Sequence, residues 1–265
     1  MNHLPSPKQL SRAVKGAAAE RDMNERRIRR WIAAITLMEA FNIARARGSL
    51  PDYLVKGGFA LEFRFQSAAR ASRDIDIVLP LDADALLEVA IETLRIEWSG
   101  FTFRIKGVPE RREVAYRLEV AVRYRSTEWS TFDVELAFGS VRASDRIEPL
   151  DLSEFGLLRP GTIPCMTAEE QIAQKLHALS DTGENRPRDV IDVVLLDRLL
   201  ALDDTVLRRY CIETFAARAT HVWPPTIELR PGWDVQIADL ITRFELPLSV
   251  NDAITDVRRL VARLR

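Results

Sequence analysis

Apolar and polar side chains alternate in several stretches of the first half of the chain, with the two-residue period of a β-strand. The most regular stretch runs from Asp74 to Leu79, where carboxylates alternate with isoleucines. We expect further strands at Tyr53 to Lys56, Phe101 to Ile105, Glu113 to Arg125 and Thr131 to Phe138. The longer ones are rich in β-branched and aromatic residues, and we expect them to lie antiparallel in one sheet.

Apolar residues with helical spacing occupy most of the remaining chain. A long helix is expected from Asn24 to Gly48, and shorter ones at Phe59 to Phe65 and from Asp82, a capping residue, to about Glu97. Beyond residue 165 almost every segment has this period. The helices expected there are Thr167 to Leu179, Pro187 to Leu200, Asp204 to Arg218, Val235 to Phe244 and Asn251 to Leu264.

These patterns divide the chain into three parts. Residues 1–23 are polar and contain two prolines, so we expect a loose N-terminal arm. Residues 24–145 form a domain with a sheet, and residues 146–265 form a helical domain that begins with a proline-rich connector. The predicted fold class is α+β (α/β mixed): a mixed sheet with flanking helices, followed by a C-terminal helical bundle.

Composition limits the classes of protein without selecting one. The 265 residues are 47% hydrophobic and 29% charged, a globular balance, and the formal net charge of -1 gives no overall basic field for nucleic acid. Arginines cluster locally, which leaves room for a polyanion track. Two distant cysteines form neither a disulfide framework nor a zinc site and suit a reducing cytosol. Without a secretory signal or a membrane-spanning apolar stretch, we expect a soluble cytoplasmic protein.

Two carboxylates on one strand are the first chemical signal. Because successive side chains of a strand point to opposite faces, Asp74 and Asp76 share one face while the isoleucines face the core. Side chains two residues apart on a strand lie about 7 Å apart, so their negative charges repel unless a cation lies between them. Mg²⁺ takes oxygen ligands and bridges carboxylates to phosphates. The alternative is a solvated edge strand.

A second strand offers a third carboxylate. Between Thr131 and Phe138 the apolar residues line one face, while Asp133 and Glu135 occupy the other. A buried unpaired charge costs several kcal/mol, so this strand either has a wet face or contributes to the metal site. We favour Asp133 as the third ligand, because a third carboxylate activates the attacking hydroxyl in two-metal phosphoryl chemistry.

Lys56, Gly57 and Gly58 join a predicted strand to a predicted helix. Glycines at such a turn let backbone N–H groups approach a phosphate, and the helix N-terminus adds partial positive charge. Gly-Gly is also a common tight turn, and its position before Asp74 is what makes a phosphate site the preferred interpretation.

The helical half contains a further group of ionisable residues. Lys175 lies one turn from Gln171 and would reach a triphosphate, unless it is only a solvated lysine. Asp189 and Asp192 lie one turn apart and would face one pocket, or else cap a helix and pair with a neighbouring arginine. For His177, structural and substrate-adjacent roles stay open.

The ordered segments together resemble the AbiEii/AbiGii nucleotidyltransferase toxins, which belong to the DNA polymerase β-like superfamily and include the MenT-like toxins of mycobacteria. The similarity spans roughly residues 50–200. It lies in Lys56 to Leu61, Arg73 to Asp76, Asp133, Gln171 to Leu179 and Arg188 to Asp192.

The resemblance implies a polymerase β-like fold and transfer of a nucleotide from an NTP, with Mg²⁺ assisting and pyrophosphate leaving. It implies a toxin of a bacterial toxin–antitoxin pair, an RNA acceptor such as the 3′ end of tRNA, and a cognate antitoxin. By matching position, Asp74 and Asp76 would bind metal, and Lys175 would contact the nucleotide phosphates. Asp192 would be a further essential acid, with Arg188 and Asp189 of the same motif beside the nucleotide.

One departure from the superfamily pattern concerns phosphate binding. Many members place Ser after the first glycine of the turn, where this chain has Gly58. Ser72 is the nearest hydroxyl to the acidic pair, and we expect it to contact phosphate or to be a modification site that silences the enzyme, because added phosphate would repel NTP.

These expectations combine into a hypothesis for the mechanism. Two Mg²⁺ ions would be held by the predicted metal ligands Asp74, Asp76 and Asp133, and Asp133 would also accept or position the acceptor proton. Lys56 and Lys175 would neutralise the departing pyrophosphate. Two alternatives remain: transfer to a small-molecule or protein hydroxyl, as in AMPylation, and a non-enzymatic nucleic-acid-binding module with vestigial carboxylates.

Overall fold

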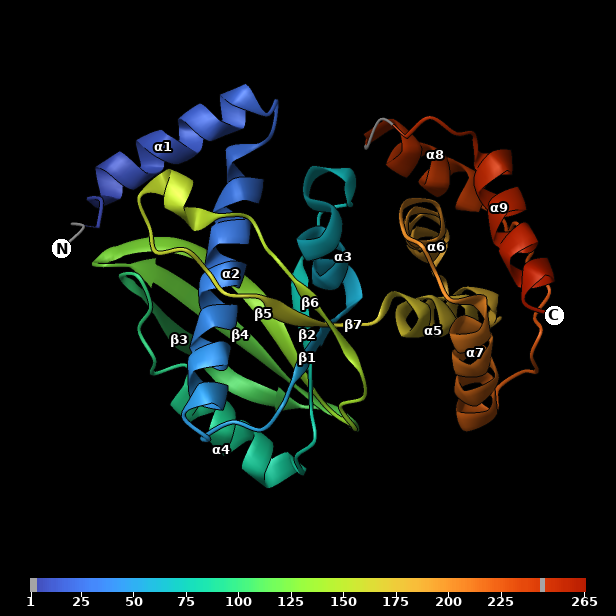
Figure 1. The fold of residues 1–265 in the computed structure, drawn as a ribbon, viewed down its shortest axis with the longest axis horizontal. Coiled ribbons are helices and arrows are strands. Elements are labelled where there is room, and N and C mark those ends of the chain that lie inside the picture. Colours follow the sequence, from blue (N-terminus) through green and yellow to red (C-terminus); the bar gives the residue numbers. More distant parts are fainter. Residues whose placement is uncertain (1–3, 244–245) are drawn as a thin grey trace. The chain divides into compact units, whose positions relative to one another are not determined.

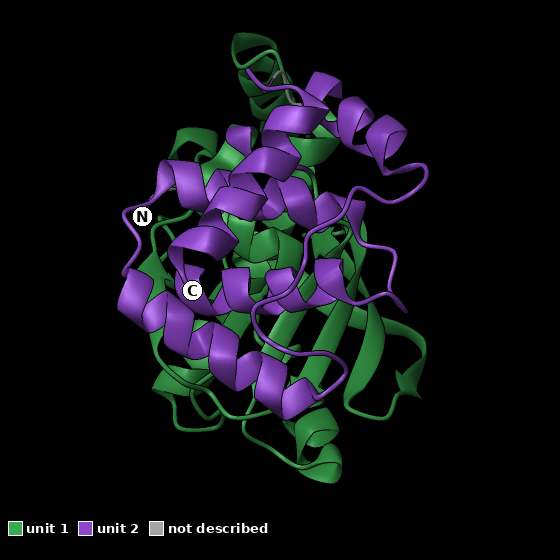
Figure 2. Cartoon of the chain, turned by 90° about the vertical axis from the view of Figure 1, so that its right-hand side faces the viewer, with its two compact units in different colours: residues 1–67, 71–165 green, residues 68–70, 166–265 purple. Residues whose placement is uncertain are grey.

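The computed structural model of the chain describes residues 4–243 and 246–265 and contains two compact units (Figure 2). Unit 1 comprises Met1–Ser67 and Ala71–Cys165, and unit 2 comprises Ala68–Arg70 and Met166–Arg265. None of the described helices is both long and apolar enough to cross a membrane.

The described part of unit 1 is built on a seven-stranded sheet in the order β3-β4-β5-β2-β1-β7-β6. The central strand β2 pairs in parallel with β5 and antiparallel with β1, so the sheet is mixed, as predicted. The strands are β1 (Leu54–Lys56), β2 (Asp74–Leu79), β3 (Phe101–Arg111), β4 (Ala115–Tyr124), β5 (Thr127–Phe138), β6 (Ser144–Ile147) and β7 (Ile163–Met166).

Helix α2 (Glu25–Ala46) crosses one face of this sheet and contributes most of its length to the core (Figure 1). Asn24 caps its first turn by accepting a hydrogen bond from the N–H of Arg26. Its buried residues meet the inward side chains of β3, β4 and β5 in one hydrophobic core. The other helices of unit 1 are α1 (Pro7–Glu20), α3 (Gly57–Phe65) and α4 (Ala83–Thr93), with short 3-10 turns at Gln66–Ala68 and Leu152–Phe155.

Unit 2 is helical in the described residues, as predicted. Helix α5 packs against α6 and α7, and α6 packs in turn against α8 and α9. The helices are α5 (Ala168–Ser180), α6 (Pro187–Leu199), α7 (Asp204–Arg218), α8 (Trp233–Arg243) and α9 (Val250–Arg263). The predicted end of α8 at Phe244 lies outside the described residues.

The predicted loose arm over residues 1–23 is wrong for the residues that the structure describes, because α1 fills most of it. Ser6 forms a capping box with Gln9, and Pro7 stands at the first helical position, where its missing N–H costs nothing. Leu10 and Val14, one turn apart, are fully buried. Pro7 therefore starts a helix. Residues 1–3 of the predicted arm lie outside the described residues.

The segment expected to open the helical domain instead contributes to the sheet. Within residues 146–165, β7 pairs in parallel with β1, with Val55 opposite Cys165, and the chain passes into unit 2 after that strand. The N–H of Gly161 donates to the buried carboxylate of Glu39, which also holds Asn42. The connector is therefore fixed to unit 1 by strand pairing and by a buried acid on α2.

Candidate active site

Asp74 and Asp76 lie on the sheet face opposite the core. Ile75 and Ile77, which alternate with them, are fully buried, whereas Asp74 is exposed and Asp76 half-buried. The alternation inferred from the sequence is therefore present on β2, which is a central strand and not the solvated edge strand of the alternative interpretation.

The register of the sheet brings further acids beside this pair. In the parallel ladder between β2 and β5, Asp74 lies opposite Asp133 and Asp76 opposite Glu135. Neighbouring strands lie about 4.8 Å apart, and residues in register place their side chains on the same face. Four carboxylates from two strands thus share one small area of the sheet. We call Asp74, Asp76, Asp133 and Glu135 the acidic patch.

Arginines of β4 and of the turn that precedes it border the acidic patch. Arg117 of β4 donates to Asp133 at 2.6 Å, and Arg112 lies 3.5 Å from Glu135. The hydrogen bond and charge of Asp133, with smaller contributions from Glu110 and Asp74, raise the pKa of Arg117 above its ordinary value. The carboxylate of Asp133 is therefore already paired with a cation. Among the described residues, no three carboxylates of the patch have ligand atoms that all lie within 4.8 Å of one another.

Gly57 opens helix α3 directly beside Asp76. In the antiparallel pairing of β1 with β2, Lys56 lies opposite Asp76, and the helix begins at the next residue. Gly57 has a φ of 66°, and a Cβ built on it would lie 2.0 Å from Oδ2 of Asp76. The two glycines do not form the separate turn that we predicted. They bring the N-terminus of a helix against a carboxylate of the patch.

Ser72 is buried and holds the first carboxylate of β2. Its hydroxyl donates to the carbonyl of Asp74 at 3.2 Å and lies 3.4 Å from Oδ1 of the same residue. Only 3% of Ser72 is exposed. In this structure the hydroxyl orients Asp74, and its predicted contact with phosphate and its modification remain predictions.

Glu62 of α3 is a positioning residue that the sequence analysis missed. Its buried carboxylate accepts Nε1–H of Trp31 at 2.5 Å and the backbone N–H of Ser72. Burial raises the pKa of Glu62, and the hydrogen bonds from Ser72 and Trp31 only partly offset this effect. The carboxylate thus ties α2 to the backbone that leads into Asp74. Its signal in the sequence was a single acid within the apolar run Phe59–Phe65.

In unit 2, Lys175 is enclosed by the two predicted acids of α6. Its Nζ donates to Asp189 at 2.7 Å and to Asp192 at 2.6 Å. Arg70, which the sequence analysis did not single out, holds the same Asp192 through two parallel bonds of 3.0 Å. The structure therefore brings these three predicted residues together, whereas Arg188 is exposed on the first turn of α6.

The ion pairs in this cluster outweigh the cost of burial. Burial alone would lower the pKa of Lys175, but the charges of Asp189 and Asp192 leave it raised. Burial alone would raise the pKa of Asp192, but Lys175 and Arg70 leave it lowered. Two cations and two anions thus neutralise one another where water is excluded. Lys175 would have to leave these partners to contact a nucleotide phosphate.

A family profile described as the nucleotidyl transferase AbiEii toxin of type IV toxin–antitoxin systems matches residues 43–255. The match spans both units, including β2, the start of α3 and the cluster around Lys175. The chain belongs to the AbiEii family. It is therefore a nucleotidyltransferase toxin, and its family implies an NTP substrate and an antitoxin partner.

The solved structure of MenT4 is similar to this chain at the level of the fold. MenT4, a nucleotidyltransferase toxin from Mycobacterium tuberculosis H37Rv, is 18% identical over 98% of this chain and 99% of its own, with a TM-score of 0.60. An antigenic nucleotidyltransferase-like protein from Paracoccidioides brasiliensis is 12% identical over 83% of this chain and 95% of its own, with a TM-score of 0.43. No curated protein sequence matches this chain. The predicted resemblance and fold class are confirmed.

Proposed function

We propose that this AbiEii protein is a Mg²⁺-dependent toxin that transfers a nucleotide from an NTP to RNA, in the cytoplasm, with the 3′ end of tRNA as acceptor. The observation that carries the proposal is the register of β2 with β5, which sets Asp133 and Glu135 beside Asp74 and Asp76. The start of α3 against Asp76 adds a site for phosphate.

The acidic patch fits Mg²⁺ by the chemistry of its donors. All of its ligand atoms are carboxylate oxygens, which Mg²⁺ prefers, and Asp74 is open to solvent. Asp74 and Asp76 would hold the metal, with Asp133 joining them. When bound, Mg²⁺ supplies the Lewis acidity that activates the acceptor hydroxyl and neutralises charge on the leaving pyrophosphate.

The remaining site residues have distinct tasks in this proposal. The N–H groups at the start of α3, opened by Gly57 and Gly58, bind phosphate oxygens, and Lys56 adds a full positive charge. Asp133, once released by Arg117, accepts or positions the proton of the acceptor hydroxyl. Lys175 is proposed to contact the triphosphate.

An RNA acceptor is supported by cations on the sheet that carries the patch. Arg104 and Arg123 are exposed on β3 and β4, and the strand register places them on the face of the sheet that carries the patch. Such a group attracts phosphate backbones even though the formal net charge of the chain is -1. The arginines would hold the acceptor strand, while its terminal hydroxyl reaches the patch.

The test is a transfer assay that identifies both the nucleotide and the acceptor. The purified chain is incubated with each of the four α-labelled NTPs and Mg²⁺, with total tRNA in one series and total bacterial protein in the other. We expect label in the tRNA band, and none when EDTA replaces Mg²⁺. Label only in the protein fraction would favour AMPylation-like transfer over RNA modification. Absence of label in both series would overturn the proposed reaction.

A further inference from the structure

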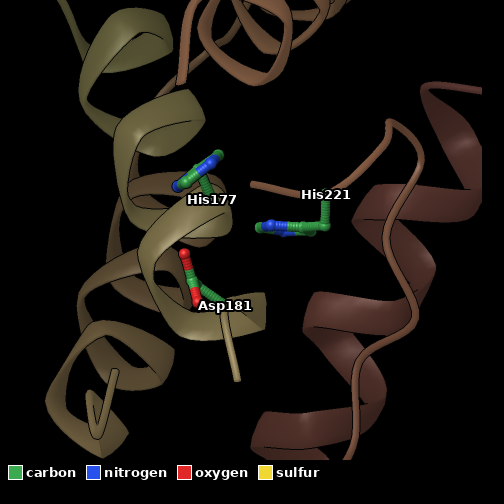
Figure 3. Close-up of side chains that lie close together, drawn as sticks. All are labelled: His177, Asp181 and His221. Carbon is green, nitrogen blue, oxygen red and sulfur yellow. The ribbon is translucent and has the colours of Figure 1, made fainter. Parts of the chain in front are cut away.

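Unit 2 contains a second group of ligand-type side chains, which has no part in the proposed transfer. His177 and Asp181 lie four residues apart at the end of α5, and His221 follows α7 (Figure 3). One possible ligand atom of each lies within 4.8 Å of those of the other two. Among the described residues, these three side chains therefore lie close enough together to hold one metal ion.

The hydroxyl of Thr220 lies at the centre of the contacts between these three residues. Its Oγ1 is 3.1 Å from Nε2 of His177, 2.9 Å from Nδ1 of His221 and 2.9 Å from Oδ2 of Asp181. In a tetrahedral Zn²⁺ complex with bonds of about 2.0–2.1 Å, ligand atoms lie about 3.3 Å apart. The three distances from Oγ1 of Thr220 to these ligand atoms are therefore close to the ligand–ligand distances in such a complex.

Hydrogen-bond partners show that His221 is arranged as a ligand. The hydroxyl of Ser180 donates to the carbonyl of Leu176 at 2.7 Å, so it accepts the proton of Nε2 of His221, also at 2.7 Å. The lone pair of Nδ1 is then directed at Thr220. Histidines that bind a metal through one nitrogen commonly donate the other N–H to a nearby oxygen in this way.

The hydroxyl of Thr220 has too few protons to satisfy its neighbours. A hydroxyl donates one hydrogen bond, whereas two acceptors face it: the carboxylate of Asp181, which also accepts the N–H of Gly183, and Nδ1 of neutral His221. One of these two acceptors is left without a proton from Thr220. A cation at this point would satisfy both acceptors at once.

We propose that His177, Asp181 and His221 bind one Zn²⁺-class transition-metal ion, with Thr220 or a water in the fourth position. Two imidazoles and one carboxylate suit Zn²⁺ far better than Mg²⁺. The metal ties α5 to residues 219–232, which form neither helix nor strand between α7 and α8. Its role is to fix this connection within unit 2.

The hydrogen bond between Arg218 and His177 competes with metal binding. Its Nη1 lies 3.3 Å from Nδ1 of His177, which must accept this bond, so the ring proton is on Nε2 and points to Thr220. Binding a metal through Nε2 moves that proton to Nδ1 and displaces the guanidinium. Arg218 is exposed at the end of α7 and is free to turn into solvent. Removing it should therefore strengthen metal binding.

The experiment measures Zn²⁺ binding to the untagged full-length chain after chelator treatment. Calorimetric titration with ZnCl₂ should show one site, and thermal unfolding should shift upward with Zn²⁺ but not with Mg²⁺. His221→Ala and Asp181→Asn should lose at least about 100-fold in affinity, because each removes a ligand. Arg218→Gln should bind as tightly as the natural chain or more tightly, because the Gln amide oxygen accepts the Nδ1 proton.

His3→Ala is the matched control, since His3 is the other histidine of the chain, and it should bind Zn²⁺ unchanged. If calorimetry shows no Zn²⁺ binding, or if binding survives both ligand substitutions, the proposed metal site is overturned. These readouts are independent of nucleotide transfer.

Discussion

Gly57 is subject to two constraints at one backbone position. Its φ of 66° lies in the left-handed region that side chains disfavour, and the space where a Cβ would stand is filled by Asp76. Because Gly57 has no side chain, the backbone at the start of α3 can lie directly against a carboxylate of the acidic patch. The sequence predicted a phosphate site at the glycine pair but not this contact, which depends on the pairing of β1 with β2.

Gly57→Ala should abolish nucleotide transfer while leaving most of the fold intact. The added methyl group would push Asp76 out of place and cost about 1–2 kcal/mol in backbone strain. Transfer rate and urea unfolding should be measured together. Gly107→Ala is the control, because Gly107 also has a positive φ of 69° but nothing lies within 4 Å of its Cβ position. Equal activity in the two variants would contradict the role of Gly57.

The residues of the acidic patch were predictable to different degrees. Asp74 and Asp76 follow from the period of one strand, which is local information. The pairing of Asp133 with Arg117 depends on the register of β4 with β5, and no pattern within either strand reveals it. Glu62 was missed because an acid inside an apolar helix indicates burial, but not which backbone N–H it accepts.

At the scale of secondary-structure elements, α5 and α6 are joined by buried ion pairs. Lys175, Asp189 and Asp192 are all buried, and Arg70 completes a neutral set of four. Removing one partner of such a set leaves an uncompensated charge in a dry interior, whereas the intact set contributes little net stability. The cluster therefore specifies how these helices pack, whatever it also does for the nucleotide.

Lys175→Met should destabilise unit 2 by about 3–5 kcal/mol, because the aspartates of α6 lose their shared cation. Urea unfolding followed by circular dichroism measures this loss. Arg188→Gln, one residue from Asp189 but exposed, should change stability by no more than about 0.5 kcal/mol. If Lys175→Met were as stable as the natural chain, the ion pairs would have no structural role, and a role confined to nucleotide binding would be favoured.

The same cluster predicts an acid-dependent loss of stability. The folded pKa of Asp192 lies below its unfolded value of about 3.9, so its contribution is present above that pH and is lost as the pH falls through the folded pKa. The stability difference between the natural chain and Asp192→Asn should therefore be largest near pH 6 and shrink below about pH 4. A difference that stayed constant between pH 6 and pH 3 would contradict the lowered pKa.

Element positions followed well from the sequence where a local signal marks them. The bounds of β2 and α7 agree with the prediction, and Thr167 and Asp82 cap the expected helices. Helix α1 was missed because the polarity of residues 1–23 and their two prolines favoured a loose arm, whereas Pro7 stands at the start of the helix. Strand β7 was missed because its pairing with β1, more than 100 residues away, has no local signature.

For the whole molecule, the sequence predicted a mixed sheet followed by helices, and the structure and the family confirm this order. The change in hydrophobic period from two residues to helical spacing is visible over long stretches, which makes the fold class robust to local errors. The passage between units after β7 was not visible, because it depends on which strand completes the sheet. Family membership further establishes nucleotidyl transfer. The RNA acceptor and the metal are proposals that rest on the arrangement of residues at the acidic patch.

The acidic patch on β2 and β5 is proposed to perform nucleotidyl transfer. The most direct test compares transfer by Asp76→Asn with transfer by Glu119→Gln, a carboxylate of the same sheet that lies outside the patch and pairs with Lys106. Asp76→Asn should lower the rate at least about 100-fold, since a metal ligand is lost, and Glu119→Gln should change it no more than about twofold. Full activity in a folded Asp76→Asn variant would contradict the account.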